Sequence, residues 1–125
     1  AYFGHDTYPL VAMLDAGVRV AVGTDGRGSN PDLSLWRELQ YIAQTHPEVP
    51  GEAILQMGTM NGAEGLSLAD RIGTVEAGKE ASLAVVRLAD GAHLDAYARL
   101  FSPISEVVAT VIAGKLVAGR VECDK

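Results

Sequence analysis

The 125-residue chain has little cysteine, few basic residues and no long apolar run, and each shortage excludes a class of protein. One cysteine, Cys123, allows no internal disulfide, which favours a reducing compartment such as the cytoplasm. No apolar stretch approaches the roughly 20 residues of a membrane span, and residues 1–10 lack the basic and apolar regions of a signal peptide. Ten basic and 16 acidic residues give a net charge of −6, so we expect neither a membrane nor a nucleic acid as a partner.

Metal-binding patterns are scarce as well. The three histidines, His5, His46 and His93, lie on distant predicted loops, whereas a zinc site needs ligands at close or matched spacing. The combined His-x-Glu and Cys-x-x-Cys pattern of one class of zinc deaminases is absent, which excludes that class. The apolar content of 48% is nevertheless that of a globular, folded chain.

The most informative segment is VAVGTDG at 20–26, where an apolar run ends in a carboxylate. The run predicts a strand over 18–23 that is buried on both faces, as in a parallel sheet. Because α/β folds carry their chemistry at the C-terminal ends of such strands, Asp25 is the strongest catalytic candidate. The alternative is a loop carboxylate that caps the next turn, where aspartate is common.

Helical patterns flank this strand. A helix is predicted over 7–16, with Thr7 as its cap and Gly17 just past its end. Asn30 and Pro31 have the pattern of an N-cap and a first helical residue, and Trp36 lies beside the apolar stripe that follows. Three helices are predicted after the strand. The first ends near 45–47, the second begins near 50 and the third covers 59–66.

The pattern changes at residue 70, where spaced glycines and short apolar runs predict β structure. Residues 89–103 are irregular and polar and predict a loop. The strands are predicted over 82–88 and 106–112, with a hairpin turn at 113–115 that leads into 116–121. The chain thus divides into an α/β part, residues 1–66, and a β part, residues 67–125.

The α/β part is incomplete by itself. One buried strand needs parallel neighbours, and a whole (β/α)₈ barrel takes about 250 residues. Since the chain also starts at Ala1 rather than at a methionine, we expect it to be the end of a larger protein.

Five motifs follow one another in an order that resembles a known family. They are GTDG (23–26), SNPDL (29–33), MGTMNGAEGL (57–66), DRIGTVEAGKEASLAVV (70–86) and VIAGKLV (111–117). In this order the chain resembles the C-terminal part of the metal-dependent amidohydrolase superfamily. Within it, the chain is most similar to the branch of cytosine, guanine and adenosylhomocysteine deaminases and triazine chlorohydrolases.

The resemblance implies an α/β fold, with the last strand and helices of a (β/α)₈ TIM barrel in residues 1–66. Residues 67–125 would be the C-terminal strands of a small β-sandwich. The implied reaction is hydrolysis of a C–N bond, or a C–Cl bond, of a nitrogen heterocycle or amidine. A small-molecule substrate and a zinc or iron cofactor are implied as well.

The resemblance also assigns candidate site residues. Asp25 would be the carboxylate that ends barrel strand 8, which lies at the metal and takes the proton from the attacking water. His5, Ser29 and Asn30 would lie beside the substrate, although His5 could be an exposed loop residue and Asn30 a plain helix cap. The family's histidine ligands are not in this chain, so the chain alone is expected to be inactive. Ser82 departs from the family, which has an aspartate there.

A second hypothesis remains open. The chain could be a non-catalytic module in which the exposed flank of the 18–23 strand pairs with another chain. A homo-oligomer is expected under either hypothesis.

Overall fold

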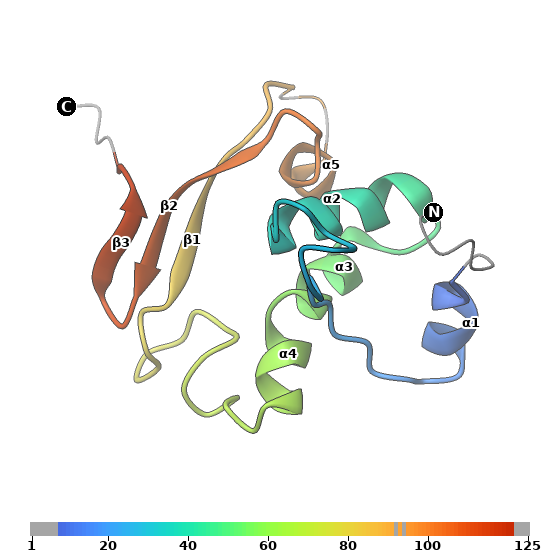
Figure 1. The fold of residues 1–125 in the computed structure, drawn as a ribbon, viewed down its shortest axis with the longest axis horizontal. Helices are drawn as coiled ribbons and strands as arrows, with labels where there is room; N and C mark the ends of the chain where they lie inside the picture. The colour runs from blue at the N-terminus through green and yellow to red at the C-terminus, as the bar shows by residue number, and fades with distance from the viewer. Residues whose placement is uncertain (1–7, 92, 94, 122–125) are drawn as a thin grey trace.

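A computed structural model describes residues 8–91, 93 and 95–121. In these residues a group of helices lies to one side of a three-stranded sheet (Figure 1). None of the helices in these ranges is long and apolar enough to cross a membrane. In chain order the elements are α1 (Leu10–Asp15), α2 (Leu35–Thr45), α3 (Gly51–Met57), α4 (Met60–Gly65), β1 (Leu83–Arg87), α5 (Ala96–Leu100), β2 (Glu106–Ile112) and β3 (Lys115–Gly119).

Helix α1 ends where the sequence predicts. Gly17 has a positive φ of 75° and donates its N–H to the Leu14 carbonyl at 2.9 Å. Val18 donates to the Met13 carbonyl at 2.9 Å, which completes the two-bond Schellman motif. The helix starts later than predicted, with Leu10 as its first residue and Pro9 at the N-cap position, so the assignment of Thr7 as its cap is wrong. Thr7 itself lies outside the described residues.

The prediction of a strand over 18–23 is wrong. The segment has no regular secondary structure and belongs to no sheet, and its backbone is held instead by the helices that follow. The Val22 N–H donates to the Met57 carbonyl at 3.0 Å, and Asn61 Nδ2 donates to the Val20 carbonyl at 2.8 Å. A parallel strand exists only beside another strand, and the described residues place none beside this segment.

Helix α2 begins later than predicted, so the assignment of Asn30 as its N-cap is wrong. Ser34 is the cap, and its Oγ accepts the Arg37 N–H at 3.3 Å. Leu33 has a φ of 50°, which interrupts any helix that would start at Pro31. The predicted end of this helix, and the predicted α3 and α4, are confirmed.

The core lies between α2, α3 and α5. Ile54 and Met57 on α3 are each 1% exposed. Trp36 packs against the core as predicted, with its ring stacked on Phe101 at a centroid distance of 5.8 Å. The buried members of the cluster are Leu10, Leu39, Val49, Ile54, Met57 and Phe101.

Helix α5 lies inside the segment that was predicted to be a loop, so that prediction is wrong in part. Asp95 caps this helix, with its side chain accepting the N–H groups of Tyr97 and Ala98 at 2.8 and 3.3 Å. A five-residue helix is shorter than the windows in which apolar periodicity is visible. The carboxylate cap was the available signal.

The predicted strands and hairpin are confirmed, and the three strands pair antiparallel in the order β1-β2-β3. Both pairings contain an irregularity, between Val85 and Val86 and between Thr110 and Val111. Gly119 has a φ of 77°, and a Cβ added there would clash with the Val108 carbonyl oxygen. Residue 119 must therefore be a glycine, because β3 lies too close to β2 at this point to leave room for a side chain.

Ser82, the departure from the family pattern, takes part in a small polar network. Its Oγ accepts the Ala113 N–H at 3.2 Å and donates to Glu80 Oε1 at 3.2 Å. Arg71 Nη2 donates to Glu80 Oε2 at 2.7 Å. The bond from Arg71, and then the one from Ser82, lowers the pKa of Glu80 below its usual 4.5. An aspartate at position 82 would face this carboxylate, so the serine suits its surroundings.

The turn between β2 and β3 provides a stability test. Ala113 and Gly114 have φ values of 49° and 78°, the two positive angles of a type I′ turn. We expect Ala113→Asn to raise the free energy of unfolding by about 0.5–1 kcal/mol, because asparagine tolerates this conformation better than alanine. Urea denaturation measures the change. Ala118→Asn within β3 is the control and should give no gain, and equal gains in both variants would contradict the assignment of the turn.

Candidate functional site

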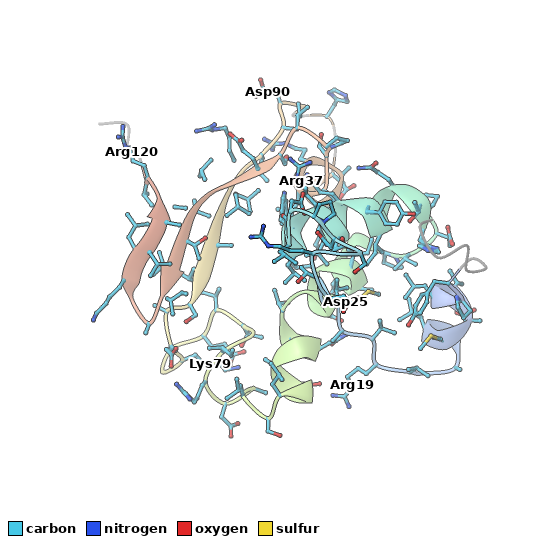
Figure 2. The ribbon with its side chains drawn as sticks, viewed as in Figure 1. Arg19, Asp25, Arg37, Lys79, Asp90 and Arg120 are labelled. Atoms are coloured by element: carbon cyan, nitrogen blue, oxygen red, sulfur yellow. The ribbon has the colours of Figure 1, made fainter. Side chains whose placement is uncertain are left out.

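Asp25 lies on the connection between α1 and α2, near the middle of the view in Figure 2. The segment before it is positioned by the bond between Val22 and Met57. Asp25 itself has a φ of 54°, a left-handed conformation that costs most L-residues about 1–2 kcal/mol and that aspartate tolerates better than most. Residues in sparsely populated backbone regions cluster at functional sites, which makes this conformation a pointer to function.

Ser29 is brought directly to Asp25. A turn over residues 27–29 places Ser29 Oγ 2.9 Å from Asp25 Oδ2, to which the hydroxyl donates. The backbone N–H groups of Ser29 and Asn30 both donate to the Gly26 carbonyl, at 3.0 and 2.9 Å. Asp25 and Ser29 are both exposed, so a solvent molecule or ligand can reach the carboxylate.

Asn30 is the buried member of this loop, with 7% of its surface exposed. Its Oδ1 accepts the Leu33 N–H at 2.9 Å, and its Nδ2 donates to Glu38 Oε1 at 2.5 Å. These contacts are internal, and a substrate contact of Asn30 stays a prediction. Sequence reasoning missed Glu38, which lies in the first turn of α2 and eight residues beyond Asn30.

The histidines are not gathered at Asp25. His5 lies outside the described residues. His46 follows α2, with Nδ1 3.4 Å from Glu48 Oε1, and His93 is exposed in the loop before α5. A catalytic zinc needs about three protein ligands, and no group of three His, Cys, Asp or Glu side chains forms within residues 8–91, 93 and 95–121. The described donors, one carboxylate and a serine hydroxyl, do not by themselves fit a metal.

Open hollows are present on the surface of the described residues, and Asp25 lines neither of the following two. One, of about 510 Å³, lies over β1, β2 and the two residues that follow β3, Arg120 and Val121. The other, of about 300 Å³, lies between the end of α1 and helices α3 and α4. The residues that line the smaller hollow are Leu14, Val18, Arg19, Ala53, Gln56, Met57, Met60, Asn61 and Glu64.

Comparison with known proteins places these features in a family. Residues 1–117 match the sequence profile of the amidohydrolase family. The 5-methylthioadenosine/S-adenosylhomocysteine deaminase of Desulforudis audaxviator is 48% identical over 87 residues, which cover 64% of this chain and 20% of that protein. The enzyme of the same name from Moorella thermoacetica is 38% identical over 127 residues, which cover 91% of this chain and 29% of that protein.

Solved structures agree with the sequence comparison. An adenosine deaminase from Xanthomonas campestris with bound zinc superposes with a TM-score of 0.76 at 29% identity, over 93% of this chain and 30% of that one. A triazine hydrolase variant superposes with a TM-score of 0.73 at 29% identity, over 89% and 27% of the two chains. The family and these neighbours imply a TIM-barrel type of fold. This chain spans between a fifth and three tenths of the length of its relatives. The chain belongs to the amidohydrolase family.

Proposed function

We propose that the whole protein is an aminohydrolase that cleaves an exocyclic C–N bond on a nitrogen heterocycle. The observation that carries the proposal is Asp25, held by Ser29 in a left-handed turn and exposed to solvent, in a chain of the amidohydrolase family. An exposed carboxylate in a fixed orientation suits a general base.

The proposed substrates are adenosines modified at the 5′ position. Relatives that are 48% and 38% identical are named 5-methylthioadenosine/S-adenosylhomocysteine deaminase, and one that is 34% identical is named 5'-deoxyadenosine deaminase. In this reaction the amino group on the purine ring leaves as ammonia and a carbonyl oxygen takes its place. A triazine substrate is the alternative, supported by the triazine hydrolase neighbour.

Asp25 acts twice in the proposed reaction. Its carboxylate accepts a proton from water while the water oxygen adds to the ring carbon that bears the amino group. The C–N bond then breaks with its electron pair on nitrogen, and the proton on Asp25 passes to that nitrogen. Ser29 donates to Oδ2, so the other carboxylate oxygen is left to accept the proton from water.

The parts of the chain are assigned within the same proposal. Residues 1–66 would belong to the barrel and residues 67–125 to the β-sandwich. Zinc or iron is the cofactor that the family implies, although the described residues alone do not fit it and no step here depends on it. We therefore expect the 125-residue chain to be inactive by itself.

Self-association of the 125-residue chain into a homo-oligomer is proposed as well, because much of its apolar surface is exposed. The accessible surface of 9002 Å² exceeds the about 6,400 Å² expected for a compact monomer of 13.1 kDa. Among the large apolar side chains, Val75, Ile104 and Leu66 are 87%, 75% and 71% exposed.

An ammonia-release assay tests the function. The protein from its complete coding sequence is incubated with methylthioadenosine, adenosylhomocysteine, 5′-deoxyadenosine and, for comparison, cytidine and an aminotriazine. We expect ammonia from the 5′-modified adenosines and none from cytidine. Ammonia from the triazine alone would replace the proposed substrate class, and no ammonia from any compound would contradict the proposed function.

A further inference from the structure

The loop that carries Asp25 and Ser29 is bounded by two residues in the left-handed conformation. Asp25 has a φ of 54° and Leu33 a φ of 50°, and neither is a glycine. Such conformations persist only where surrounding contacts determine them. Some group must therefore hold the loop between residues 25 and 33.

Asn30 makes the contacts that do so. Its backbone N–H donates to the carbonyl of Gly26, the residue after Asp25, at 2.9 Å. Its side-chain Oδ1 accepts the N–H of Leu33, at the other end of the loop, at 2.9 Å. One residue that is 7% exposed thus bonds to both ends of the loop.

Glu38 ties Asn30 to a rigid element. Asn30 Nδ2 donates to Glu38 Oε1 at 2.5 Å, and Glu38 lies in the first turn of α2. A bond between an amide and a carboxylate is stronger than a bond between neutral groups. Ser29, the neighbour of Asn30, donates in turn to Asp25 Oδ2 at 2.9 Å. The contacts therefore run without a gap from α2 to the candidate catalytic carboxylate.

We propose that Asn30, supported by Glu38, is a positioning residue that sets the direction of the Asp25 carboxylate. The inference rests on the proposed function, in which Asp25 is the base. Asn30 acts through the loop backbone and through Ser29, and it needs no contact with the substrate.

A swapped pair tests the inference in the whole protein. Asn30→Asp keeps an acceptor for the Leu33 N–H but sets two carboxylates against each other, and it should lower kcat about 100-fold with little change in KM. Glu38→Gln keeps an acceptor for Asn30 and should lower kcat only slightly. Combining both changes puts an amide donor at position 38 and a carboxylate acceptor at position 30, and this double variant should recover most of kcat.

Crystal structures and thermal melts of the same variants separate positioning from stability. We expect the Ser29 Oγ to Asp25 Oδ2 contact to be lost in Asn30→Asp and restored in the double variant, with both variants folded at the assay temperature. Unchanged kcat in folded Asn30→Asp, or an intact contact there, would overturn the inference. A wild-type protein without activity, or an active Asp25→Asn variant, would instead overturn the proposed function.

Discussion

Asp25→Asn is expected to lower kcat of the whole protein about 1,000-fold. Asparagine has the size of aspartate, and its side-chain oxygen still accepts the hydrogen bond from Ser29. It cannot take a proton from water, and general-base catalysis typically contributes about 10²–10⁴-fold. The ammonia-release assay under saturating substrate measures the loss.

Asp32→Asn is the matched control on the same loop. Asp32 Oδ2 pairs with Arg37 Nε at 3.0 Å, and Oδ1 accepts the Ser34 N–H at 3.1 Å, so its contacts lie on the helix side of the loop. We expect this variant to keep kcat within a factor of a few, since exposed ion pairs contribute little. Equal losses in the two variants, or full activity of Asp25→Asn, would show that Asp25 is not the base.

Ser105→Ala is expected to lower the free energy of unfolding by about 1–3 kcal/mol, which is the cost of one buried polar group left without a partner. Ser105 is 3% exposed. Its Oγ accepts the Ala89 N–H at 2.8 Å and donates to the Arg99 carbonyl at 2.7 Å. Alanine leaves the buried Ala89 N–H without a partner, whereas the Arg99 carbonyl still accepts the Ser102 N–H at 3.4 Å. Urea denaturation followed by circular dichroism measures the loss.

Ser102→Ala is the control for this loss. Ser102 lies close to Ser105 in the chain. It contributes to the interior through its backbone carbonyl, which accepts a hydrogen bond from Gln40 Nε2 at 2.6 Å. The substitution keeps that carbonyl, so we expect a change of less than about 1 kcal/mol. If the two serine variants lost equal stability, the hydroxyl of Ser105 would not be the group that matters.

Elements that depend on local sequence were predictable. Helices α2 and α3 follow from their apolar residues at helical spacing, and the hairpin follows from the turn residues Ala113 and Gly114. The segment 18–23 has the composition of a buried strand, but strand pairing is a property of neighbours, which the described residues do not supply. The start of α2 was missed because Asn30, a good cap by composition, is bonded to Glu38 and Leu33.

The candidate site was predictable in its composition and not in its contacts. The position of Asp25 after an apolar run, together with the GTDG and SNPDL motifs, was enough to single out Asp25 and Ser29. No sequence pattern pairs Asn30 with Glu38, because that contact depends on where the loop returns to α2. The hydrogen bonds of Ser105 could not be predicted either, because they too depend on how distant segments of the chain come together.

Helix α2 is bonded on two sides, and this has a consequence for how the protein opens. Glu38 holds the loop of Asp25, while Trp36 Nε1 and Gln40 Nε2 donate to the Ser105 carbonyl at 3.1 and 2.9 Å. Positions 36 and 40 share one helix face, and position 38 lies on the opposite face. Local unfolding of α2 would therefore release, in the same event, both the loop of Asp25 and the segment around Ser105 that leads into β2. A ligand that stabilises the loop would slow amide hydrogen exchange at the start of β2 without touching it.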